Sequence, residues 1–400
     1  MRRISTALAM SFAVLLGCSF AYGADQPGVT ATTVKIGSIF PLSGPASLLG
    51  NTGKALIAYV RYLNDAGGIN GRKIELVAYD DGYTPPKAVE QARRLVESDE
   101  VAFMFGQLGT PGNSATIKYL NAKKVPDLFI FSGANRFANF KEYPYTTTGL
   151  PSYFTEASIY AKFVAEKHPE AKVAVLYQND DLGKDFLNAF KDSFRDKSAQ
   201  LVTAGYEVAD PTVDSQVVNL KASGAEVLMI AATPKFAAQA LRRLGDIGWK
   251  PLTMINMVSS SVSATLQPVG LDKVVGVVSA AFFKDPNDAK WIDDPGMKSY
   301  RSFFDKYLPG SEFADLNYLT GYQAGLILEQ LLKQCGEDLS RENVSKQARS
   351  IKDLVLPTAL PGIVVNTSPI NSEAWTQLQL QRWNGKFWEA FGEVLSGKSE

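Results

Sequence analysis

Cysteine and histidine, the residues that most often carry out chemistry near neutral pH, are scarce in this sequence. Its 400 residues include two cysteines and one histidine. These residues form no cluster with the spacing of a metal site, and neither a GxSxG motif nor a GxxxxGKS/T phosphate loop occurs. His168 stands at a predicted helix end, where we interpret it as a surface residue. The absences argue against hydrolases and metalloenzymes, so we predict a protein that is not an enzyme and needs no cofactor or metal.

A disulfide framework is also absent. Cys18 lies in an N-terminal segment with the features of an export signal, which leaves Cys335 as the one thiol of a mature chain. With one thiol there is no internal disulfide, so packing must supply the stability. We expect a monomer, although a free thiol in an oxidising compartment has the alternative of pairing between chains.

Excess charge of either sign is missing as well. The sequence has 41 basic and 41 acidic residues, and removal of residues 1–23 with their two arginines leaves 39 against 41. A protein that binds nucleic acid needs a basic face. We therefore exclude nucleic acid as a partner.

Long hydrophobic runs are limited to one stretch near the N-terminus. A basic start, Met1-Arg2-Arg3, precedes the apolar residues 7–16, and small residues follow at Ala21-Tyr22-Gly23. The run is too short for a lasting membrane span and has the layout of a secretory signal peptide, which we assign to residues 1–23. An alternative stays open, because Leu15-Leu16-Gly17-Cys18 resembles a lipoprotein signal in which Cys18 is acylated.

The most informative segment that is present is a βαβ unit over residues 34–81. An apolar strand at 34–39 leads into the loop Ser43-Gly44-Pro45, and the helix after it places Leu56, Val60 and Leu63 on one face. In open α/β sheets, ligands bind at the carboxyl ends of the strands. The Ser43 loop is therefore a candidate wall of a binding site.

The same alternation of strand and helix recurs along the chain, which predicts an α/β fold with parallel sheets in more than one domain. Strands are expected at 101–105, 127–131, 172–177, 226–231, 252–256 and 274–280. Helices are expected at 87–97, 113–123, 153–167, 184–196, 214–222, 235–247, 296–307 and 316–335. The Asn384-Gly385 pair predicts a hairpin between 377–383 and 387–392.

Two further polar segments rich in glycine follow predicted strands, at 106–114 and 131–136. Backbone N–H groups at a helix start, with the Thr110 hydroxyl beside them, are suited to a carboxylate. Each segment alone is equally well explained as a helix cap and turn. Three such segments at successive strand ends, counting the Ser43 loop, favour one shared pocket.

Several motifs together resemble one known family. VKIGSIFPLSGPASLLG, GGINGRKIELVAYDD, KAVEQARRLVE, FGQLGTPGNSA, TTTGLPS and YQNDDLGKDF occur in order. They are similar to the branched-chain amino-acid-binding (Leu/Ile/Val-binding) family of periplasmic solute receptors for ABC importers. The resemblance spans essentially the whole mature chain.

This resemblance implies a two-lobed clamshell in which each lobe is a doubly wound, mainly parallel sheet. Three crossovers between the lobes are expected near 148–150, 279–282 and 368–374. Lobe one would then comprise 33–149 and 280–370, and lobe two 150–279 and 371–400. The protein is expected in the periplasm, with a permease of the inner membrane as its partner.

The family's pocket transfers only in part. The resemblance implies that Thr110, Ala134 and Asn135 keep the capacity to hold a ligand carboxylate. Where members that bind amino acids commonly place an acidic residue for the ammonium, this sequence has Met257. An uncompensated buried ammonium is costly, so this difference selects against amino acids unless another carboxylate takes its place.

Three further predicted wall residues, Leu49, Leu182 and Thr233, stand where the family often has a pocket tyrosine. Two tyrosines, Tyr153 and Tyr318, are also included, because their rings could stack on a ligand, and a structural role explains each of them equally well. The complete set is Ser43, Leu49, Thr110, Ala134, Asn135, Tyr153, Leu182, Thr233, Met257 and Tyr318. The predicted function is delivery of a small hydrophobic carboxylate, either an aromatic or aliphatic acid or a branched-chain amino acid, to an ABC importer by lobe closure. The alternative is a clamshell protein that signals ligand occupancy without transport.

Overall fold

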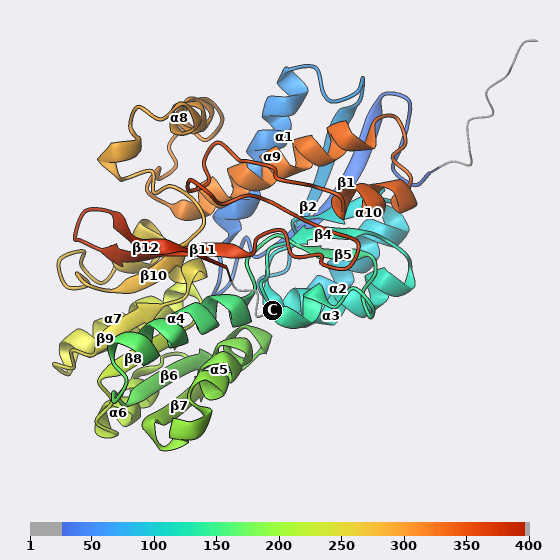
Figure 1. The fold of residues 1–400 in the computed structure, drawn as a ribbon. Helices are drawn as coiled ribbons and strands as arrows, with labels where there is room; N and C mark the ends of the chain where they lie inside the picture. Colours follow the sequence, from blue (N-terminus) through green and yellow to red (C-terminus); the bar gives the residue numbers. More distant parts are fainter. Residues whose placement is uncertain (1–25, 397–400) are drawn as a thin grey trace, which may run out of the picture.

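Two β-sheets organise the protein into two lobes (Figure 1). The computed structural model describes residues 26–396. The predicted signal peptide and the possible lipidation of Cys18 lie outside the described residues. Within residues 26–396, no helix is both long and apolar enough to cross a membrane.

Lobe one is built on a five-stranded parallel sheet with the strand order β2-β1-β3-β4-β5. Its strands are β1 (Thr33–Phe40), β2 (Lys73–Asp80), β3 (Phe103–Phe105), β4 (Asp127–Ile130) and β5 (Thr146–Thr148). The connecting helices are α1 (Gly50–Asp65), α2 (Pro85–Arg93), which continues as a π-helical turn (Arg94–Ser98), and α3 (Thr110–Ala122). A 3-10 turn (Asn135–Ala138) follows β4. Strands β1, β3 and β4 place buried apolar side chains on both faces of the sheet, whereas the edge strand β2 is only partly buried.

Lobe two is built on a seven-stranded sheet with the order β12-β11-β10-β9-β8-β6-β7. Its strands are β6 (Val173–Gln178), β7 (Leu201–Tyr206), β8 (Val227–Ala231), β9 (Leu252–Ile255), β10 (Val278–Ala281), β11 (Gln377–Trp383) and β12 (Trp388–Ser396). Its helices are α4 (Tyr153–Lys167), α5 (Asp181–Ser193), α6 (Asp214–Ala222) and α7 (Pro234–Asp246). The strands β6 to β10 pair in parallel, and the hairpin β11–β12 is added antiparallel to β10.

The chain returns to lobe one between β10 and β11. There it forms α8 (Pro295–Tyr307), α9 (Leu316–Cys335) and α10 (Arg341–Ala348), and α9 packs along α1 (Figure 1). The approach is close because α9 has glycine at the contact, and a Cβ on Gly321 would lie 2.2 Å from the Thr52 carbonyl oxygen. A larger residue at Gly321 would therefore force α9 away from α1.

Three passages of the chain between the two sheets follow from this order, after β5, after β10 and before β11. The first and third lie side by side, with Thr148 N–H donating to Ser372 O at 3.1 Å. The α/β fold in two lobes is as predicted, whereas the residue boundaries given above for each lobe stay predictions. The sequence analysis missed β5, β7 and α10, and it started β10 four residues early.

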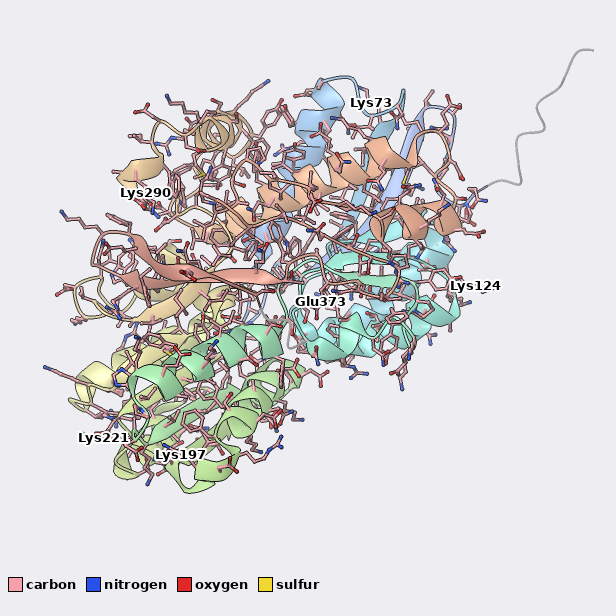
Figure 2. All side chains as sticks on the ribbon, in the orientation of Figure 1. Lys73, Lys124, Lys197, Lys221, Lys290 and Glu373 are labelled. Atoms are coloured by element: carbon pink, nitrogen blue, oxygen red, sulfur yellow. The ribbon has the colours of Figure 1, made fainter. Side chains whose placement is uncertain are left out.

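Charged side chains gather on the outside of the lobes. Lys73, Lys124, Lys197, Lys221 and Lys290 all point away from the sheets (Figure 2). This distribution makes the composition of the space between the lobes informative, because a charge there would need a specific reason.

Candidate functional site

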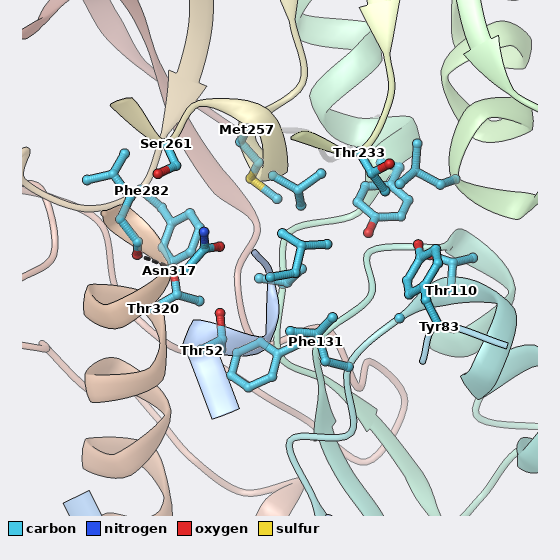
Figure 3. A pocket seen from close by; sticks show the side chains of 18 of the residues that line it. Thr52, Tyr83, Thr110, Phe131, Thr233, Met257, Ser261, Phe282, Asn317 and Thr320 are labelled. Atoms are coloured by element: carbon cyan, nitrogen blue, oxygen red, sulfur yellow. Dashed lines mark hydrogen bonds between the residues drawn. The ribbon is translucent and has the colours of Figure 1, made fainter. Parts of the chain in front are cut away.

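A cavity lies between the two lobes, where strand ends and helix starts of both sheets meet (Figure 3). The space free of protein atoms there is about 640 Å³, including the part that opens to solvent. Its lining residues are Leu49, Thr52, Tyr83, Leu108, Gly109, Thr110, Phe131, Leu150, Tyr153, Leu182, Thr233, Met257, Val258, Ser261, Phe282, Phe283, Leu316, Asn317 and Thr320. All of them are uncharged, and most are aliphatic or aromatic.

One end of the cavity carries hydroxyl groups. Thr110 Oγ1 and Ser132 Oγ are hydrogen-bonded at 2.8 Å, beside the first residues of α3. Tyr83 and Thr233 lie at the same end (Figure 3). Burial raises the pKa of Tyr153 to about 12, although hydrogen bonds to Gly133, Thr110 and Ser132 act in the opposite direction. The phenol therefore remains a hydrogen-bond donor at neutral pH.

Helix starts add to the donor character of this end. Thr110 begins α3, and Thr233 is the N-cap residue of α7. The N-terminus of a helix carries a partial positive charge and free N–H groups. The hydroxyl-bearing end is thus suited to an anion such as a carboxylate without any basic side chain.

The opposite end of the cavity is formed by the start of α9. Asp315 is the N-cap residue there and accepts hydrogen bonds from the Asn317 backbone N–H at 3.0 Å and from Asn317 Nδ2 at 2.8 Å. The same oxygen accepts from Ser261 Oγ of lobe two at 2.8 Å, and Asp315 Oδ2 accepts from Asn51 Nδ2 at 2.7 Å. Asp315 is buried behind the cavity wall, with donors of the protein on both oxygens.

Other carboxylates near the cavity are occupied in the same way. Asp180 caps α5 through the N–H groups of Leu182 and Gly183, and its second oxygen accepts from Gln178 Nε2 at 2.6 Å. Burial raises the pKa of Asp180 to about 6, with these donors acting against the shift. No carboxylate among the described residues lines the cavity.

Glu156 lies beneath the loop that carries Met257. Its Oε1 accepts from Met257 N–H at 2.6 Å and from the Tyr160 hydroxyl at 2.7 Å. Burial raises the pKa of Glu156 to about 8, so the group is mostly protonated at neutral pH. Glu156 therefore holds the loop from behind and offers no charge to a ligand.

The structure brings six of the ten predicted wall residues together around the cavity. They are Leu49, Thr110, Tyr153, Leu182, Thr233 and Met257. Four predicted wall residues do not line it: Ser43, Ala134, Asn135 and Tyr318.

Each of the four has another role. The Ser43 hydroxyl donates to Asp80 Oδ2 at 2.6 Å and shapes the loop after β1. Ala134 N–H donates to Ser132 Oγ, and Asn135 N–H donates across to Asp185 of α5. Tyr318 points away from the cavity and packs edge-on against Phe304. These four side chains therefore do not form part of the cavity wall in this structure, although the sequence predicted that they would.

Residues that sequence reasoning missed supply the rest of the wall. Tyr83 follows β2, and Phe131 follows β4, so both stand at strand ends where a pocket was expected. Asn317 and Thr320 lie on the face of α9 next to the one that carries Tyr318. The position at a strand end was the signal that could have identified Tyr83 and Phe131. To identify Asn317 and Thr320, one needs to know which face of α9 points to the cavity.

Acidic side chains that follow strands are used for hydrogen bonding. Asp80 accepts from the N–H groups of Leu42, Ser43 and Gly82. Three or more His, Cys, Asp or Glu side chains that are suited to one metal ion are not found anywhere in residues 26–396.

Two lobes that close on an uncharged cavity define a ligand-binding protein of the type that carries small solutes. Residues 33–386 match the family described as periplasmic binding protein. The Leu/Ile/Val-binding protein homolog 7 of Brucella abortus (strain 2308) is 25% identical over 336 residues, which cover 80% of this chain and 82% of the relative. The chain belongs to the periplasmic binding protein family, and its relatives are solute-binding proteins rather than enzymes.

Solved structures share the fold. A branched chain amino acid ABC transporter protein from Thermus thermophilus with bound valine has a TM-score of 0.81 at 16% identity, covering 92% of this chain and 97% of its own. A solute binding protein of an ABC transporter from R. palustris in complex with 4-hydroxybenzoate has a TM-score of 0.76 at 19% identity, covering 91% and 97%. The same fold thus holds an amino acid in one protein and an aromatic acid in another. Which kind of ligand a given chain binds depends on the residues of its own site.

Proposed function

We propose that this protein is an extracytoplasmic solute-binding protein that delivers a small hydrophobic carboxylate without an ammonium group to an ABC importer. The observation that carries the proposal is the absence of charge from the cavity wall. An α-amino acid brings an ammonium as well as a carboxylate, and a buried ammonium without an acidic partner is costly.

The acidic side chains near the cavity are not available to pair with an ammonium. Asp180 and Asp315 are occupied by donors of the protein, and Glu156 is held behind the Met257 loop. An ammonium would have to displace these hydrogen bonds before it gained a partner. A carboxylate, by contrast, meets hydroxyl groups and helix starts at the Thr110 end.

A branched-chain amino acid is the competing ligand, since the name of the Brucella relative points to it. The apolar wall around Leu49, Leu182 and Met257 suits its side chain equally well. The ammonium separates the two ligands, because the cavity wall has no acidic side chain to pair with it.

Delivery would follow from closure of the lobes. A ligand that touches both walls stabilises the closed state through its additional contacts. Leu49 and Thr110 belong to lobe one, whereas Thr233 and Met257 belong to lobe two, so a ligand between them engages both. A permease that recognises the closed surface then receives only loaded protein.

The test is to identify what the protein carries when it is purified from its native host under mild conditions. Mass spectrometry of the compound released by unfolding should find a monocarboxylate that does not react with an amine-specific reagent. Protein that has been unfolded, dialysed and refolded serves as the control and should release nothing. Recovery of leucine, isoleucine or valine from the native protein would refute the proposal.

Transport is tested separately. Deletion of the gene should abolish uptake of the identified acid by whole cells, and a plasmid copy should restore it. Normal uptake in the deletion strain would point to a signalling role for the same binding event.

A further inference from the structure

The wall formed by the start of α9 contains a polar group that the carboxylate does not use. Asn317 Nδ2 donates to Asp315 Oδ1 at 2.8 Å. Because a carboxylate oxygen accepts hydrogen bonds and does not donate them, the amide nitrogen must face Asp315 and the amide oxygen must face away. Asn317 Oδ1 lies on the cavity wall and has no hydrogen-bond partner among the described residues.

The neighbouring hydroxyl groups do not satisfy this oxygen. Ser261 Oγ donates its proton to Asp315, and Thr320 Oγ1 donates its proton to the Leu316 carbonyl oxygen at 3.0 Å. Thr52 also lines the cavity, and its hydroxyl makes no hydrogen bond to another described residue. This end of the cavity therefore presents an acceptor on Asn317 and an adaptable hydroxyl on Thr52.

The two polar ends are separated by apolar side chains. Thr110 and Tyr83 stand on one side of the cavity, Asn317 and Ser261 stand on the other, and leucine, methionine and phenylalanine side chains fill the wall between them (Figure 3). A carboxylate held at the Thr110 end leaves the Asn317 end to the remote end of the same ligand. An apolar remote end would leave the Asn317 oxygen buried without a partner, which is unfavourable.

We propose that the ligand carries a hydroxyl group at the end remote from its carboxylate, and that Asn317 and Thr52 recognise it. The hydroxyl donates to Asn317 Oδ1 and accepts from the Thr52 hydroxyl, so it uses both free groups of this wall. An ammonium suits the wall less well, because it brings a charge and three donors, whereas the wall offers two neutral acceptors, the Asn317 amide oxygen and the Thr52 hydroxyl. This inference rests on the proposed function and narrows it to hydroxylated aromatic or aliphatic monocarboxylates.

The test compares acids that differ only in the remote group, by calorimetric titration of ligand-free protein. One set is 3-(4-hydroxyphenyl)propanoate with its unsubstituted and 4-methoxy analogues, and the other is 6-hydroxyhexanoate with hexanoate. The methoxy group accepts a hydrogen bond but does not donate one. In at least one set, the hydroxylated acid should bind about tenfold more tightly than each analogue, as expected when a buried acceptor gains its donor.

Asn317→Leu should remove this preference, so that the hydroxylated acid and its analogues bind with equal affinity. Thr320→Val is the matched variant on the same helix face. It should retain the preference for the hydroxylated acid, because the Thr320 hydroxyl donates its hydrogen bond to the helix backbone and not to the ligand. Thermal melting curves of both variants check that they fold.

The result that overturns the inference is equal affinity for hydroxylated and unsubstituted acids, or a preference that survives in Asn317→Leu. Such a result leaves the proposed function intact, since the acids still bind. Tight leucine binding with no response to any of these acids would refute both proposals.

Discussion

Asn135 of lobe one donates its backbone N–H to Asp185 Oδ2 of lobe two at 2.7 Å. Beside this bond, Asp181 Oδ2 accepts from Ser114 Oγ at 2.9 Å and pairs with Arg136 at 3.2 Å. The first turns of α5 thus fasten the lobes together next to the cavity. The ion pair is partly exposed and contributes little. Burial raises the pKa of Asp185 to about 7, with the Asn135 N–H acting against the shift, so this hydrogen bond joins the lobes at a partly desolvated carboxyl group.

Asp185→Ala should weaken ligand binding by about tenfold, because the closed state loses one hydrogen bond between the lobes while the open state loses nothing. Calorimetric titration measures the change. Asp192→Ala is the matched control, since Asp192 is exposed on the same helix and pairs only within lobe two, with Arg195. Equal dissociation constants for wild type and Asp185→Ala would show that this bond does not hold the closed state.

Glu156 should make stability depend on pH. Burial raises its pKa from 4.5 to about 8. Between these values the folded protein holds a proton that the unfolded chain has released, so the free energy of unfolding should fall as the pH rises. Glu156→Gln cannot ionise and should remove this part of the slope, as measured by thermal or urea unfolding at several pH values.

Glu166→Gln is the control for this prediction, because Glu166 is exposed on the same helix and its side chain is 57% accessible. The pH slope of the control should match that of the wild type. An unchanged slope in Glu156→Gln would contradict the assignment of the titration to Glu156.

Gly109 should not tolerate a side chain. Its φ is 115°, and a Cβ would lie 2.9 Å from the ring of Tyr83. Gly109→Ala should lower the free energy of unfolding by ~1–3 kcal/mol and weaken binding, because the strained backbone and the displaced Tyr83 both change the cavity. In Gly245→Ala, where nothing lies within 4 Å, stability should change by less than ~1 kcal/mol. Similar melting temperatures for the two variants would argue against a fitted Gly109–Tyr83 contact.

Met257→Glu should convert the site towards amino acids. Met257 lines the cavity and is 6% exposed, so a glutamate there would supply the missing partner for an ammonium. We expect the affinity for leucine to rise by at least about tenfold and the affinity for hydrophobic acids to fall through repulsion of their carboxylate. Met257→Gln has a similar shape without the charge and should show neither change in the titrations. A glutamate variant that still ignores leucine would mean that position 257 does not face the ligand's polar end.

The general architecture was predictable because its causes are local and repeated. The apolar strand containing Ile36 and Ile39 and the amphipathic helix after it read clearly as a βαβ unit. Strand β7 was missed because Thr203 and Gly205 interrupt an edge strand that is only partly buried. The rule that ligands lie at strand ends was enough to place Thr110 on the cavity, whereas Thr233 was predicted from the family resemblance.

The parts of the site that sequence reasoning missed depend on orientation. On α9, one residue changes direction by about 100°, so Tyr318 was chosen although Asn317 faces the cavity. Asn135 was assigned to the ligand, but its N–H meets Asp185, a residue 50 positions away in the other lobe. Such contacts follow from how the lobes close, which no local pattern contains.

The most direct test of the central claim compares leucine with 4-methylpentanoate, which has the same carbon skeleton and carboxylate but no ammonium. Both compounds are titrated calorimetrically into protein that has been unfolded, freed of ligand and refolded. The uncharged cavity predicts tighter binding of 4-methylpentanoate, by about tenfold or more, because leucine leaves its ammonium without a partner. Tighter binding of leucine would contradict the account.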